Sequence, residues 1–100
     1  MSLAISEKQL ALIKQILARQ KFKAGAAYVF GSRARGTARE YSDLDLAVDN
    51  NGGAIPPKTI LRLMLDFENS LLPYKVDIVD LNNISAEFKS LIIRDLVRLN

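Results

Sequence analysis

Apolar residues recur with helical spacing near the start of the chain. Leu10, Ile13 and Leu17 occupy positions i, i+3 and i+7, so they share one face of a helix. The segment just before them, residues 6–9, has the Ser-x-x-Gln form of a capping box, which marks a helix start. The pattern therefore predicts a packing helix over residues 7–19.

Two short apolar runs follow, at residues 26–30 and 44–48, and both have strand propensity. The segment between them, residues 32–42, is polar and basic, which is typical of a short helix or turn across the end of a sheet. A connection of this length fits either a parallel crossover or an excursion between antiparallel strands. The direction of the two strands therefore stays open.

The strongest turn signal, Asn-Asn-Gly-Gly at residues 50–53, precedes a second long helix. The Pro56-Pro57 pair suits the first turn of that helix, which we expect to end before Pro73. Its predicted core face consists of Ile60, Leu63, Met64, Phe67 and Leu71.

A third strand is predicted over residues 75–81, with Asp77 and Val79 on one face. Ser85 is the expected N-cap of a last helix. The predicted core stripe of this helix is Phe88, Ile92, Leu96 and Leu99. The order of elements predicts one α/β (α+β) domain over residues 1–100, with a small sheet.

Composition narrows the possible chemistry. The 100 residues include no Cys and no His, which excludes disulfides, zinc-thiolate sites and Ser-His triads. We expect a cytoplasmic protein, because there is neither a signal-peptide pattern nor an apolar run of about 18 residues. The net charge of +3 is mild, and the clustered bases are Arg33, Arg35 and Arg39. This clustering favours a local anion site over a broad nucleic-acid surface.

Three carboxylates stand out in the strand pattern. Asp43 and Asp45 are two residues apart, so in a strand they share a face at a separation of about 7 Å. Asp77 interrupts the middle of the third apolar run. Convergence of the three requires a cation among them, and oxygen-only ligands favour Mg²⁺.

A candidate phosphate site precedes these carboxylates. The backbone N–H groups and the hydroxyl of the Gly31-Ser32 turn could hold the phosphates of a substrate, and Arg33 or Arg35 could neutralise them. Together with the carboxylates, this outlines a two-metal phosphoryl or nucleotidyl transfer site. Each piece alone has an ordinary structural explanation, as a turn, an edge-strand charge or a solvated arginine. The hypothesis therefore rests on their combination.

The residues that carry this hypothesis also carry a family resemblance. The string Gly-Ser-Arg-Ala-Arg-Gly at residues 31–36, Ser-Asp-Leu-Asp at residues 42–45 and a later strand Asp77 resemble the minimal nucleotidyltransferase (MNT) branch of the DNA polymerase β-like nucleotidyltransferase superfamily. The resemblance covers residues 26–81. It implies a mixed sheet flanked by helices.

The resemblance also implies a role for each motif residue. Asp43 and Asp45 would bind catalytic Mg²⁺, as two ions, and Asp77 would complete the site and help to activate the acceptor hydroxyl. Gly31 and Ser32 would hold the phosphates of ATP or another nucleoside triphosphate.

Partners follow from the same resemblance. Members of this branch are commonly encoded beside a HEPN-domain protein, in pairs that resemble toxin–antitoxin modules in which the MNT chain transfers AMP to its partner. We expect this chain to lack the second domain of larger relatives, so that substrate choice depends on another chain. A small-molecule acceptor such as an antibiotic, or a catalytically idle module that neutralises a partner by contact, are the alternatives.

Further apolar residues lie beside both predicted core stripes. They are Leu61, Leu65 and Leu72 in the middle helix, with Ile93 and Val97 in the last. Either these two helices pack side by side, or the second stripes contact another chain in a homodimer or a stable complex.

Overall fold

The computed structural model describes residues 3–19 and 26–99. Four helices and four strands form in this part of the chain. In chain order they are α1 (Glu7–Arg19), β1 (Ala26–Phe30), α2 (Ser32–Arg35), β2 (Leu44–Asp49), α3 (Pro57–Glu68), β3 (Val76–Asp80), α4 (Ala86–Ile92) and β4 (Val97–Arg98).

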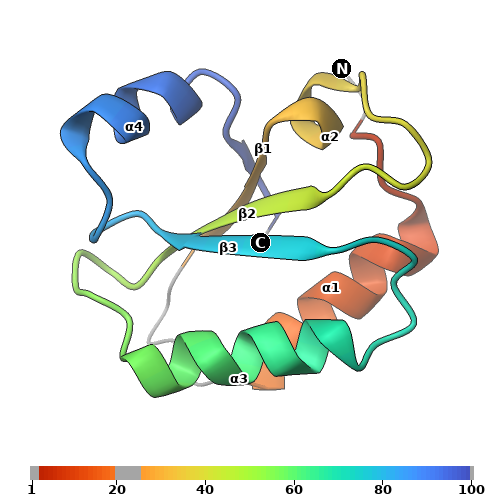
Figure 1. Ribbon diagram of the computed structural model, residues 1–100, viewed down its shortest axis with the longest axis horizontal. Helices are drawn as coiled ribbons and strands as arrows, with labels where there is room; N and C mark the ends of the chain where they lie inside the picture. The colour runs from red at the N-terminus through yellow and green to blue at the C-terminus, as the bar shows by residue number, and fades with distance from the viewer. Residues whose placement is uncertain (1–2, 20–25, 100) are drawn as a thin grey trace.

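The strands form one mixed sheet in the order β3-β2-β1-β4 (Figure 1). β1 and β2 are antiparallel, so the segment that carries α2 is an excursion between antiparallel strands and not a parallel crossover. β2 and β3 are parallel and are joined through α3, and β4 runs antiparallel to β1. The predicted mixed sheet flanked by helices is confirmed.

The two faces of the sheet are covered unequally. Helices α1 and α3 lie along one face, and α4 lies on the other (Figure 1). The larger core joins α1 and α3 to the first face through residues that include Ile13, Ile16, Leu63, Phe67, Val29, Leu44 and Leu46. The smaller core, beneath α4, contains Phe30, Ala47, Leu81 and Ile92. The second face therefore keeps room for polar side chains beside a small apolar patch.

The predicted helix starts are confirmed by their capping bonds. The Gln9 N–H donates to Ser6 Oγ at 3.1 Å, and the Ser6 N–H donates to Gln9 Oε1 at 3.3 Å, as in a capping box. Ser85 Oγ accepts from the Phe88 N–H at 3.1 Å at the start of α4. Pro57 is the first residue of α3. Proline suits this position because a backbone N–H in the first turn of a helix has no partner within the helix.

The predicted core face of the middle helix is only partly correct. Leu63 and Phe67 are buried, but Met64 is 49% exposed. Leu71 lies beyond the end of α3 and is 93% exposed. The helix does end before Pro73, as predicted, because the chain tightens into a turn in which the Ser70 N–H donates to the Phe67 carbonyl at 3.1 Å.

The last helix is shorter than predicted, and its predicted C-terminal half was wrong. α4 ends at Ile92, and Val97 belongs to β4, where it pairs with Val29 of β1. The Leu99 N–H continues this pairing to the Ala27 carbonyl at 2.8 Å, and the Leu99 side chain enters the larger core. The predicted stripe therefore divides between the two cores, with Ile92 and Leu96 in the smaller core and Leu99, after β4, in the larger one.

The additional apolar residues beside the predicted core stripes are not buried between the two helices. α3 and α4 lie on opposite faces of the sheet, so they do not pack side by side (Figure 1). Leu61, Leu65 and Ile93 are 56%, 46% and 57% exposed. Across the described residues, no helix is both long and apolar enough to cross a membrane.

Candidate active site

Two of the predicted carboxylates lie side by side on the half-covered face. Asp45 of β2 and Asp77 of β3 are register partners in the parallel pair. They point to the face of α4, because Ala47, two residues beyond Asp45, packs in the smaller core. Asp43, one residue before β2, is exposed at the entrance to the same strand.

The electrostatics of Asp45 show that the three carboxylates are neighbours. Partial burial raises the pKa of Asp45, and the negative charges of Asp77 and Asp43 raise it further. The positive charge of Arg35 acts in the opposite direction. The ionised form of Asp45 is therefore disfavoured until a cation offsets the charges around it.

We call Asp43, Asp45 and Asp77 the acidic cluster. Gly31 brings the turn after β1 against one member of this cluster, Asp45. Its backbone has φ 74° and ψ −154°, a region that is accessible almost only to glycine. A Cβ atom at this position would lie 2.5 Å from Oδ2 of Asp45. The glycine is therefore required by both the turn geometry and the close approach.

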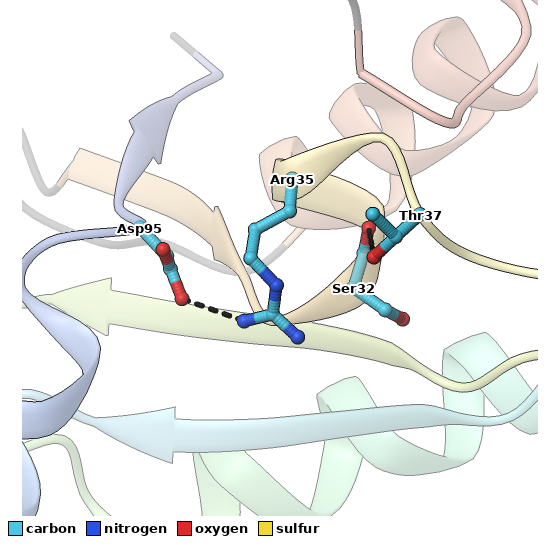
Figure 2. A network of polar contacts seen from close by, with 4 residues as sticks. All are labelled: Ser32, Arg35, Thr37 and Asp95. Carbon is cyan, nitrogen blue, oxygen red and sulfur yellow. Dashed lines mark hydrogen bonds and ion pairs between the residues drawn. The ribbon is translucent and has the colours of Figure 1, made fainter.

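Ser32 begins α2 directly after this glycine. Its carbonyl accepts hydrogen bonds from the Thr37 N–H at 3.0 Å and from Thr37 Oγ1 at 3.4 Å (Figure 2). In the described part of the chain its hydroxyl has no hydrogen-bond partner, so it is available to a ligand. The predicted role of Gly31 and Ser32 at the phosphates fits this placement.

The two arginines of the motif have different surroundings. Arg33 is 4% exposed, and its guanidinium group lies 3.7 Å from the centroid of the Tyr74 ring. It makes five hydrogen bonds, all to backbone carbonyls, which belong to Ala4, Arg39, Glu40 and Ser42. Arg33 is therefore turned into the protein, where it fixes the loop that leads to Asp43, and we do not retain it as a phosphate ligand.

Arg35, in contrast, extends toward the acidic cluster. Its Nη1 donates to Oδ2 of Asp95 at 2.8 Å, and the Arg35 and Asp95 side chains are 52% and 27% exposed. Asp95 lies in the turn after α4, and sequence reasoning missed it because a single carboxylate between a helix and a strand has no distinctive pattern. Figure 2 shows the guanidinium group of Arg35 in front of β2.

The charges fit a divalent cation, although the carboxylates are not gathered as ligands. Among residues 3–19 and 26–99, no group of three or more His, Cys, Asp or Glu side chains is close enough to hold a metal ion as it stands. Asp77 instead pairs with Lys75 Nζ at 3.6 Å. The donors are all carboxylate oxygens, the ligand type that Mg²⁺ prefers.

The chain is similar to a known family and to a named bacterial protein. The family model described as polymerase beta, nucleotidyltransferase matches residues 12–99. A Haemophilus influenzae protein named "Probable protein adenylyltransferase MntA" is 38% identical over 93 residues, which cover 90% of this chain and 77% of that protein.

Solved structures also resemble this chain. One, described as the crystal structure of a toxin–antitoxin with AMP-PNP, matches with a TM-score of 0.77 and 26% identity, over 91% of this chain and 72% of that one. Another, whose description includes the words "minimal nucleotidyltransferase", matches with a TM-score of 0.70 and 34% identity, over 97% of this chain and 95% of that one.

Proposed function

The chain belongs to the polymerase beta nucleotidyltransferase family, and on that basis we propose that it transfers AMP from ATP to a hydroxyl group of a partner protein. The observation that carries the proposal is the meeting of Asp45 and Asp77 with the turn at Gly31 on the open face of the sheet. The two carboxylates are suited to bind cations, and the turn is suited to bind phosphates. The name of the relative from Haemophilus influenzae supports adenylyl transfer to protein.

Asp43, Asp45 and Asp77 are the residues that would hold Mg²⁺, and two ions fit the usual arrangement of such sites. When bound, the ions would neutralise the phosphates and stabilise the charge that develops in the transfer. The pKa of Asp45 is raised mainly by burial and further by the negative charges of Asp77 and Asp43, and this second contribution supports the assignment.

The remaining steps fall to groups of the chain itself. The Ser32 hydroxyl and the backbone N–H groups of the turn would bind the phosphates of ATP, and Arg35 would add a positive charge beside them. Asp77 would orient the acceptor hydroxyl and accept its proton. The acceptor oxygen then bonds to the α-phosphorus, the bond from that phosphorus to the oxygen bridging to the β-phosphate breaks, and pyrophosphate leaves.

The proposed acceptor is a HEPN-domain toxin encoded beside this chain. A solved relative is described as a toxin–antitoxin with AMP-PNP, which supports a toxin partner and a nucleotide substrate. The open face around the acidic cluster gives a second protein access to the site. AMP on a side chain of the toxin would then neutralise it, and this chain would be the antitoxin.

Incubation with α-labelled ATP tests the proposal. The purified chain is mixed with the product of the neighbouring gene, with Mg²⁺ or with a chelator. Label on the partner that requires Mg²⁺ supports the proposal, and Asp43→Asn or Asp45→Asn should abolish it. Asp49→Asn is the matched control, because Asp49 lies at the other end of β2 and bonds to Asn82 and Gly52. Label that persists in Asp45→Asn would contradict the assignment.

A second candidate function is neutralisation of the partner by contact alone. The exposed apolar side chains of Leu91 and Ile93, at 73% and 57%, favour it, because they lie at the end of α4 on the same face as the acidic cluster. In that case the two proteins would form a complex and the toxin would be neutralised without transfer of label. Label on a small molecule in place of the partner would instead indicate the antibiotic type of acceptor.

A further inference from the structure

Arg35 is held by a residue from a distant part of the chain. Asp95, 60 positions further along, accepts a hydrogen bond from Arg35 Nη1 at 2.8 Å (Figure 2). The backbone at Asp95 is itself fixed, because its N–H donates to the Ile92 carbonyl at 3.0 Å in the turn that ends α4. The C-terminal part of the fold thus reaches into the site through this one carboxylate.

The pair uses only part of the arginine. Within the described residues, Nη1 is the nitrogen of Arg35 with a hydrogen-bond partner, whereas Nε and Nη2 have none. A guanidinium group presents its donors in a planar fork, so a carboxylate at one end fixes the direction of the others. In Figure 2 the unpaired end of the group is turned away from Asp95, in front of β2.

Stability does not account for this contact. The Arg35 side chain is half exposed, and exposed ion pairs contribute little to the free energy of unfolding, since water and salt screen them. A positioning effect needs no large energy. It needs only that a long, flexible side chain spends more of its time in one conformation.

We propose that Asp95 is a positioning residue, which holds Arg35 with Nε and Nη2 directed at the phosphate chain of a nucleoside triphosphate. This inference rests on the proposed function. Asp95 does not contact the substrate itself. Its carboxylate orients the cation that does, in the way that outer carboxylates orient metal-binding histidines.

The charge of Asp95 by itself would change phosphate affinity in the opposite direction to positioning. A carboxylate near a bound polyanion repels it, so removal of the Asp95 charge alone would tighten phosphate binding. If Asp95 orients Arg35, its removal weakens binding instead. The direction of the change therefore separates positioning from charge.

The experiment measures binding of ATP and of inorganic pyrophosphate by calorimetry, with Mg²⁺ and at fixed ionic strength. We expect Asp95→Asn to weaken both by about two- to fivefold, the scale of an exposed ion pair. Arg35→Ala should weaken them at least as much. In the Arg35→Ala background, Asp95→Asn should cause no further loss, because there is no longer a side chain to orient.

Two controls complete the design. Glu68→Gln removes the same charge from an exposed position at the end of α3, on the other face of the sheet, and should not weaken binding. Asp95→Glu keeps the carboxylate and should recover part of the affinity. Thermal melts of each variant show whether the fold is retained.

Three results would overturn the inference. They are unchanged or tighter binding by Asp95→Asn, an equal loss in the presence and absence of Arg35, and no recovery in Asp95→Glu. Each of these, found while the unmodified protein binds ATP and transfers AMP, overturns the role of Asp95 alone. An unmodified protein that binds neither ATP nor pyrophosphate overturns the proposed function as well.

Discussion

Substitution of Gly31 by alanine tests the geometry of the site most directly. The φ of 74° and ψ of −154° place the residue where a side chain costs about 1–3 kcal/mol in backbone strain. For a domain of this size, that strain corresponds to a loss of on the order of 5–20 °C in Tm. The alanine methyl group would also meet Oδ2 of Asp45 at 2.5 Å, well inside ordinary contact distance.

Asp45 must therefore move by about 1 Å to restore a normal contact. A displacement of about 1 Å at a reacting centre costs on the order of 100-fold in rate. We expect Gly31→Ala to fold with a lower Tm, and to transfer AMP to its partner about 100-fold more slowly than the unmodified protein. Thermal melts and single-turnover labelling at saturating Mg²⁺ measure the two effects separately.

Gly52→Ala is the matched control for backbone strain. Gly52 also has a positive φ, 84°, but a Cβ there would meet no atom within 4 Å. Its alanine variant should lose stability and keep its transfer rate. The reasoning is refuted if Gly31→Ala transfers AMP at the unmodified rate, or if Gly52→Ala slows transfer equally, since the loss would then follow from strain and not from the displacement of Asp45.

Three further predictions concern other residues of the site. Asp45→Asn should stabilise the metal-free protein at neutral pH, because burial and the charges of Asp77 and Asp43 raise the pKa of Asp45 and so disfavour its ionised form in the fold. The stability deficit of the unmodified protein relative to Asp45→Asn should close as the pH falls through the raised pKa toward 3.8, because Asp45 is then protonated. Thermal melts at a series of pH values measure this deficit. A deficit that widens on acidification would contradict the charge assignment. Arg33→Met should lower the free energy of unfolding by about 1–3 kcal/mol, because it leaves backbone carbonyls without donors, and Arg33→Lys should rescue little, since an ammonium group lacks the planar fork. Denaturant titrations of the two variants test this, and losses below about 0.5 kcal/mol would show that the buried guanidinium is dispensable. Ser32→Ala should raise the KM for ATP more than it lowers kcat, as loss of a ground-state phosphate contact does, whereas a change confined to kcat would place the hydroxyl at the reacting phosphate.

Much of the secondary structure could be predicted because its signals are local. The bounds of α1 and β1 follow from apolar spacing and a capping box, and they are as predicted. Asp45 and Asp77 were expected on strand faces from alternation alone, and the parallel register of β2 and β3 places them side by side. For these features, the residues that decide the structure lie within a few positions of each other.

Other features depend on which distant segments meet. Arg33 and Arg35 occupy the same short motif, yet Arg33 is buried against Tyr74 and Arg35 reaches Asp95. The strand β4 was predicted as helix, because Val97 continues a helical spacing that its pairing with Val29 overrides. Periodicity shows which residues of one segment face the core and which face solvent. It carries no information about which distant segment packs against the buried face. The sequence by itself therefore determined most of the elements, the strand positions of Asp45 and Asp77 and the glycine turn. The tertiary structure alone decided the pairing of β4, which arginine faces the site and which carboxylate holds it, since these depend on contacts made across the folded chain.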